Sequence, residues 1–132
     1  MKYPIFHNAT QYLKFREGKG LFRFFKRFFE RRSLNIALKG LKDIKSVCDC
    51  PSGPGRLFEF WKKKKLKITA VDLSPDMIQA SKKELDRINA TGKVISSDAF
   101  NLHKSNIPQT DLVASVRFVY YFDKNQRLEL LK

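Results

Sequence analysis

The sequence has little cysteine and no long apolar run, and each shortage excludes a class of protein. Its two cysteines, Cys48 and Cys50, are one residue apart, which is too close for a useful disulfide and leaves no second pair for a zinc site. It has no run of about 18 uncharged apolar residues, so we expect no membrane span. Residues 1–10 lack a basic segment followed by an apolar stretch, so we expect no secretory signal. The sequence predicts a reduced, cytoplasmic chain without a metal site.

Acidic residues are also scarce. The 132 residues include 27 Lys and Arg against 13 Asp and Glu, which gives a formal net charge of +14. Such an excess favours anionic partners, such as nucleic acid or an acidic membrane surface, although it says nothing about the fold. The length is that of one domain, which can bury a core without disulfides.

The hydrophobic pattern divides the chain into residues 1–42 and residues 43–132. We predict that the first part is a helical segment on the lid or substrate side, and that the second is the main domain. In the second part short β-branched runs alternate with amphipathic helical patterns, which predicts parallel strands joined by right-handed crossovers. The expected strands are 46–49, 68–72, 94–98 and 111–116. The expected fold is an α/β, Rossmann-like parallel sheet with helices on both faces.

Two helix starts in this part carry capping signals. Ser74 is followed by Pro75, a residue favoured at the first helical position, so we expect Ser74 to cap a helix. Asp123 is followed three residues later by Gln126, which is the spacing of a capping box.

Ligands of such sheets bind at the carboxyl ends of the strands. Gly53 and Gly55 follow the first strand, where glycine lets the backbone approach a ligand closely. Asp72 ends the second strand, and its two oxygens suit the two hydroxyls of a ribose. Phe58 obstructs a position that a dinucleotide-binding turn keeps small, and Asp49 is a poor neighbour for a pyrophosphate. The sequence therefore favours S-adenosylmethionine, which carries an amino group and a sulfonium cation, over NAD.

Four segments in order resemble one family. Residues 47–57, VCDCPSGPGRL, look like motif I of the class I S-adenosylmethionine-dependent methyltransferases, and residues 70–77, AVDLSPDM, look like the acidic-loop motif that follows. The resemblance continues through residues 97–100 and 111–118, and it covers roughly residues 43 to 132. It implies an enzyme that transfers a methyl group from S-adenosylmethionine to an unidentified acceptor, which is a small molecule, a lipid or a nucleic acid.

The resemblance also implies which residues contact the cofactor. Asp49, with the two glycines, would lie by the methionine part, Asp72 by the ribose, and Asp98 by the adenine edge. Pro51 stands where many members carry a first glycine. The expected cofactor-binding residues are Asp49, Pro51, Gly53, Gly55, Arg56, Asp72, Leu73, Met77, Asp98, Ala99, Val116 and Arg117.

No dedicated catalytic base can be named from the sequence. Tyr120 and Tyr121 follow the fourth strand, where the family often places residues that face the reacting methyl group, but one of them packing into the core explains them equally well. If the acceptor must lose a proton, Tyr120, Tyr121 or Asp111 could assist.

A complete class I fold has three further strands, whereas this sequence stops after the fourth. We therefore expect the strand order 3-2-1-4, with the fourth strand at an open edge that a second chain or a second copy would cover. The same shortness keeps open an alternative, a non-catalytic S-adenosylmethionine-binding or interaction module from a truncated methyltransferase.

The segment 21–32 is strongly amphipathic. Its apolar residues fall in one arc of a helix, with basic residues and Glu30 opposite. The arc consists of Leu21, Phe22, Phe24, Phe25, Phe28 and Phe29. Three interpretations stay open: packing on its own domain or acting as a cofactor lid, lying on an anionic membrane, or binding nucleic acid. The last two define another alternative function, a basic membrane- or RNA-associated protein.

Overall fold

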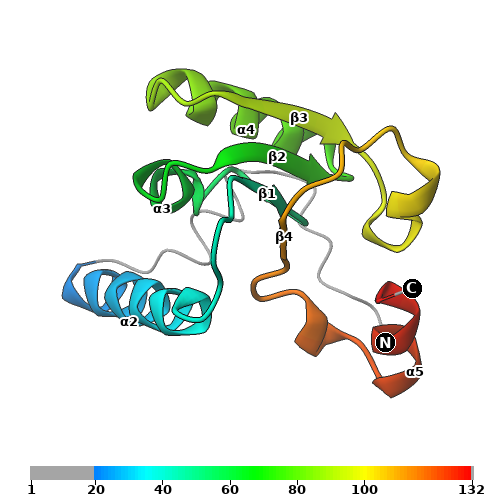
Figure 1. The fold of residues 1–132 in the computed structure, drawn as a ribbon, viewed down its shortest axis with the longest axis horizontal. Coiled ribbons are helices and arrows are strands. Elements are labelled where there is room, and N and C mark those ends of the chain that lie inside the picture. Colours follow the sequence, from blue (N-terminus) through cyan, green and yellow to red (C-terminus); the bar gives the residue numbers. More distant parts are fainter. Residues whose placement is uncertain (1–19, 132) are drawn as a thin grey trace.

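A computed structural model describes residues 20–131 of the chain (Figure 1). Residues 1–19, part of the predicted N-terminal segment, lie outside the described residues. The elements in chain order are α2 (Leu21–Leu38), β1 (Ser46–Asp49), α3 (Phe58–Lys63), β2 (Lys67–Asp72), α4 (Pro75–Arg87), β3 (Gly92–Ser96), the 3-10 helix η1 (Ala99–Lys104), β4 (Leu112–Ala114), the 3-10 helix η2 (Val119–Tyr121) and α5 (Lys124–Leu130).

The four strands form one parallel sheet in the order β3-β2-β1-β4, which confirms the predicted order. In the register of β1, which is one of the two inner strands, Cys48 lies opposite Thr69 of β2 and Val113 of β4. Because all strands run in the same direction, their carboxyl ends meet at one edge of the sheet (Figure 1). The segments that follow β1, β2, β3 and β4 therefore gather at that edge.

Side chains from the sheet are buried on both of its faces. Val47 belongs to the larger core cluster, in which the fully buried Phe58 and Trp61 are the largest members. Cys48, the next residue of β1, belongs to a second cluster with Cys50 and Val71. Successive residues of a strand point to opposite faces, so β1 contributes to both clusters. The prediction that the two cysteines are core residues is confirmed.

The limits of two strands differ from the predicted ones, because β3 is shifted by two residues toward the N-terminus and β4 is shorter. β3 ends at Ser96, because the Asp98 side chain accepts a hydrogen bond from the Phe100 N–H (3.0 Å) and caps η1 instead of extending the strand. β4 begins after Asp111, whose carboxylate accepts hydrogen bonds at the start of β1, and it ends before Arg117, which has a φ of 60°.

The two predicted helix starts are observed, with one difference in hydrogen bonding. Pro75 opens α4, but the Ser74 side chain makes no capping hydrogen bond. Instead, the backbone N–H of Ser74 donates to the Asp72 carboxylate. Asp123 and Gln126 form the predicted capping box at the start of α5.

Helix α2 is longer than the amphipathic segment seen in the sequence, and it contains no buried residue. Leu34 and Leu38, in its C-terminal half, pack against the larger core cluster. The phenylalanine-rich arc is exposed, with values from 47% at Phe25 to 72% at Leu21. Within residues 20–131, none of the helices has the length and apolarity that crossing a membrane requires.

Candidate cofactor-binding site

The turn after β1 has a backbone that requires glycine. Gly53 has a φ of 56° and Gly55 a φ of 86°, both in the left-handed region that side chains disfavour. A Cβ atom on Gly55 would lie 2.5 Å from the ring of Phe58, which fills the core behind the turn. A Cβ atom on Gly53 would meet nothing within 4 Å. The turn is therefore packed tightly on the Gly55 side and open on the Gly53 side.

The carboxylate of Asp72 connects this turn to β2. Its Oδ2 atom accepts a hydrogen bond from the Gly53 N–H (2.9 Å), and its Oδ1 atom accepts one from the Ser74 N–H (3.0 Å). On the other side of the turn, the Ser81 hydroxyl donates to the Gly53 carbonyl oxygen (2.7 Å). Each carboxylate oxygen has two acceptor positions, so one hydrogen bond does not exhaust the acceptor capacity of an oxygen. Burial raises the pKa of Asp72, and the backbone N–H donors oppose that rise.

Asp49 is a buried carboxyl at the end of β1, only 2% exposed. Its Oδ2 atom accepts a hydrogen bond from the Trp61 indole N–H (2.9 Å). Burial raises the pKa of Asp49 to about 7, although the Trp61 hydrogen bond and the charge of Arg56 act in the opposite direction. A cation placed beside this carboxyl would favour its charged form. Asp49 is therefore suited to a positively charged ligand group.

Glu30 joins helix α2 to this edge of the sheet. Its Oε2 atom forms an ion pair and hydrogen bond with Nη1 of Arg56, which follows the glycine turn. Its Oε1 atom lies 3.0 Å from Nε of Arg117, which follows β4, in an ion pair without hydrogen-bond geometry. The Glu30 side chain is only 10% exposed. One carboxylate thus holds both predicted cofactor-binding arginines.

The remaining predicted cofactor-binding residues follow the carboxyl ends of the strands but show less direct links to the turn. Met77 is buried in the first turn of α4, whereas Leu73 is 64% exposed. Asp98 caps η1, and Ala99 packs against the cysteine cluster. Val116 packs against the larger core cluster, and Pro51 is half-buried in the turn. For all of these residues the roles in cofactor binding stay predictions.

The three suggested catalytic residues do not lie together. Tyr120 and Tyr121 form η2 after the carboxyl end of β4, where the Tyr120 hydroxyl donates to the Tyr121 hydroxyl (3.0 Å). Asp111 precedes β4, and its Oδ2 atom accepts hydrogen bonds from the N–H groups of Lys45 and Ser46 (both 2.9 Å). It therefore lies at the amino ends of β1 and β4, away from the site, and is no longer a candidate proton acceptor.

Three residues that contact the site were not predicted from the sequence. Glu30 could have been identified from the sequence, because it is the single acidic residue in α2. Trp61 and Ser81 could not, because an indole or a hydroxyl on the inner face of a helix usually indicates only packing. In the described part of the chain, no group of three or more His, Cys, Asp or Glu side chains could hold a metal ion.

Comparisons with known proteins agree with this architecture. The profile of the family described as "Methyltransferase domain" matches residues 47–132. Similar solved structures include a putative S-adenosyl-L-methionine-dependent methyltransferase from Methanococcus maripaludis, with 19% identity over 99% of this chain and 60% of that one, and a TM-score of 0.68. A comparison with curated protein sequences found no match.

Two further structures resemble this chain in the same way. Magnesium protoporphyrin IX methyltransferase from Synechocystis PCC 6803 is 14% identical over 96% of this chain and 65% of that one, with a TM-score of 0.69. A SAM-dependent methyltransferase from Archaeoglobus fulgidus is 23% identical over 92% of this chain and 49% of that one, with a TM-score of 0.62. The chain thus spans between 49% and 65% of the length of these three proteins.

At this level of identity the solved structures establish the fold, a Rossmann-like methyltransferase fold. The match over residues 47–132 goes further, because it covers more than half of the sequence. The chain belongs to the methyltransferase domain family.

Proposed function

We propose that this chain binds S-adenosylmethionine at the carboxyl edge of its sheet and serves the transfer of the methyl group to an unidentified acceptor. The observation that carries the proposal is the carboxylate of Asp72, which backbone N–H groups of Gly53 and Ser74 fix beside the open side of Gly53. Membership of the methyltransferase domain family supports it, as do the S-adenosylmethionine-dependent methyltransferases among the similar structures.

The residues of the site fit the parts of this cofactor. Asp72 would accept hydrogen bonds from the two ribose hydroxyls. The absence of a Cβ atom at Gly53 would let the ligand approach the backbone. Asp49, in its charged form, would offset the positive charge of the amino and sulfonium groups. The bound cofactor would supply an electrophilic methyl group on its sulfonium.

For catalysis the chain must also orient the acceptor and exclude water, because orientation supplies much of the rate of such a transfer. Tyr120 and Tyr121, after β4, remain the residues that we propose to face the acceptor. We also propose a cytoplasmic location, since both cysteines are free and buried, as is usual in a reducing compartment.

Calorimetric titration of the 132-residue chain with S-adenosylmethionine, S-adenosylhomocysteine and adenosine tests the binding site. Asp72→Asn should weaken all three ligands about tenfold or more, because all three contain the ribose. Asp49→Asn should weaken S-adenosylmethionine much more than adenosine, because adenosine lacks the charged part. Asp86→Asn, on the exposed side of α4, is the matched control. Unchanged affinity in the Asp72 variant would disprove the ribose assignment.

A second function, that of a non-catalytic module that binds S-adenosylmethionine and pairs with another chain, is favoured by the edge of the sheet. Val113 on β4 is 62% exposed, and β4 is an edge strand of the described sheet, so a second chain could pair there. A chain that binds S-adenosylmethionine but yields no S-adenosylhomocysteine with any acceptor would be a binding module of this kind. Radiolabelled methyl transfer, measured beside the titration, separates the two functions.

A further inference from the structure

We propose that α2 carries, on the side facing away from the sheet, a docking surface for an anionic lipid bilayer. This outer face consists of Leu21, Phe22, Phe25 and Phe29, which are 47% to 72% exposed. So many large apolar side chains on one helix face form a contiguous patch of the kind that marks a membrane or partner contact. The proposal goes beyond the methyltransferase function and does not depend on it.

The orientation of α2 follows from the contacts of its opposite side. Leu34 and Leu38 pack against the core cluster, and Glu30 holds Arg56 and Arg117. Leu34 is nine residues from Phe25, which at 100° per residue is half a turn around the helix. Helix α2 lies at the periphery of the described fold (Figure 1). The domain therefore holds one side of the helix, and the outer face points away from it. Phe24 and Phe28 lie between the two sides, along the groove next to Glu59 of α3.

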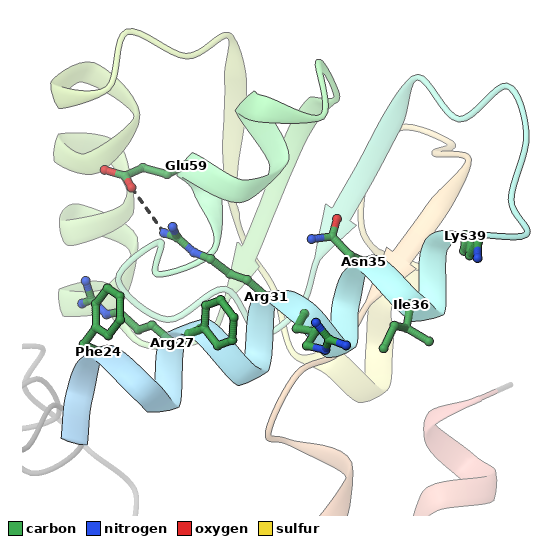
Figure 2. A pocket seen from close by; sticks show the side chains of 9 residues that line it. Phe24, Arg27, Arg31, Asn35, Ile36, Lys39 and Glu59 are labelled. Atoms are coloured by element: carbon green, nitrogen blue, oxygen red, sulfur yellow. Dashed lines mark hydrogen bonds and ion pairs between the residues drawn. The ribbon is translucent and has the colours of Figure 1, made fainter. Parts of the chain in front are cut away.

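The charges of α2 suit the phosphates of anionic lipids. Between residues 21 and 38 the helix has five basic side chains and one acidic one, Glu30, which is turned inward. A groove of about 760 Å³ runs along the helix next to Glu59 of α3. Arginine and lysine side chains line it together with phenylalanines and Ile36 (Figure 2). Of the five basic residues, Lys26 and Arg32 lie next to the outer face at 100° per residue, and Lys26 lies over the Phe22 ring. Cations beside apolar side chains are the pattern of helices that lie in the membrane interface.

A bilayer explains this face better than a nucleic acid does. A phosphodiester backbone needs cations, and single-stranded bases stack on a few aromatic rings. Neither uses a face of four adjacent large apolar side chains, whereas the boundary between headgroups and acyl chains does. Because the described helices are too short or too polar to span a membrane, the contact would be interfacial.

Sedimentation of the full chain with lipid vesicles tests the proposal. The two vesicle types are phosphatidylcholine alone and phosphatidylcholine with phosphatidylglycerol in about a 3:1 ratio. We expect binding to the anionic vesicles that weakens as salt rises. The double variant Phe25→Ser, Phe29→Ser should reduce partitioning about tenfold or more, because each buried phenyl ring contributes strongly.

Matched controls separate the outer face from general effects. Leu128→Ser with Leu131→Ser removes two exposed leucines from the end of the chain and should leave binding unchanged. Lys26→Gln with Arg32→Gln should weaken binding more than Lys82→Gln with Lys83→Gln on α4, although both pairs remove the same charge. Thermal melting and circular dichroism verify that each variant is folded.

Three results would overturn the proposal. The first is absence of binding to anionic vesicles by the folded chain. The second is evidence of general electrostatic attraction, which is either binding that the Phe25, Phe29 variant retains in full or tighter binding to a single-stranded RNA. The third is a wild-type dimer that becomes a monomer in that variant without any vesicle binding, which would assign the face to a second copy.

Discussion

Asp49 shows how strongly one residue depends on its surroundings. Its carboxyl is almost completely buried, and burial raises its pKa to about 7. The folded state therefore binds a proton at Asp49 more tightly than the unfolded state does. Between about pH 4 and pH 7 the contribution of this group to the free energy of unfolding falls as pH rises, because ionising the buried carboxyl costs energy.

The variant Asp49→Asn should remove this dependence. An amide oxygen can still accept the Trp61 hydrogen bond but cannot ionise. At about pH 4 the two proteins should have similar stability, and between pH 5 and pH 8 the stability of the variant relative to the original protein should rise by roughly 2 to 4 kcal/mol, at about 1.4 kcal/mol for each unit of pKa shift. Thermal or urea unfolding from pH 5 to 8 measures the difference. A difference that stays constant across this range would contradict the raised pKa.

At the residue scale the sequence predicts the residues that the backbone geometry requires. It does not predict the contacts between side chains that are far apart in the sequence. Gly53, Gly55 and Asp72 could be identified because turn geometry and the end of a strand specify them. Glu30 and Trp61 reach the site from helices, over sequence separations of 26 residues to Arg56 and 12 to Asp49. No local pattern encodes such pairs, since they depend on how α2 and α3 pack.

At the scale of elements, the attachment of α2 depends on two ion-pair groups of different burial. Glu30, 10% exposed, holds Arg56 and Arg117, whereas Glu59 on α3, 43% exposed, pairs with Arg31 and Arg87. Removing one charge from a buried group leaves its partners unpaired, which costs more than removing a charge from a solvated group.

The variant Glu30→Gln should therefore destabilise the protein by about 1 to 3 kcal/mol, and Glu59→Gln by less than about 1 kcal/mol. The loss should be local, with faster hydrogen exchange across residues 21–38 than across the sheet. Exchange measured by mass spectrometry, beside urea unfolding, provides both values. Equal effects of the two variants would mean that Glu30 does not anchor α2.

Element boundaries were harder to predict than the elements themselves. β1, β2 and the start of α4 follow from β-branched runs and from Pro75, and the observed limits of both strands and the first residue of the helix agree closely with expectation. β3 ended early because the Asp98 carboxylate caps η1, and β4 began late because the Asp111 carboxylate accepts hydrogen bonds at the start of β1. An aspartate at the end of an apolar run continues a strand or caps the next turn equally well in sequence, and only the fold decides.

At the scale of the whole molecule, the alternation of strands and helices specified the fold and the strand order. The exposed side of α2 could not be foreseen, because an apolar arc normally indicates packing on the same domain. Leu21, Phe22, Phe25 and Phe29 of the arc are turned outward because Glu30, Leu34 and Leu38 hold the other side. Tertiary contacts therefore determine which side of α2 faces the domain.

The two cysteines offer a measure of global unfolding. Cys48 and Cys50 are 2% and 4% exposed, and burial raises the pKa of the Cys48 thiol to about 11. Both thiols are thus neutral and shielded at pH 8 in the folded chain. We expect a disulfide reagent to label them together, at least about a hundredfold more slowly than in urea, as β1 is an inner strand. Rapid labelling of either cysteine without denaturant would show that β1 opens locally.

One side of helix α2 contacts the arginines beside the glycine turn, and the opposite side is exposed on the outside of the molecule. A ligand that competes with Glu30 for Arg56 or Arg117 would loosen the helix, and a surface that holds the phenylalanines would tighten or shift it. Binding free energies at two such positions are linked reciprocally. If the first occupant changes the affinity of the second by a given factor, the second changes the affinity of the first by the same factor.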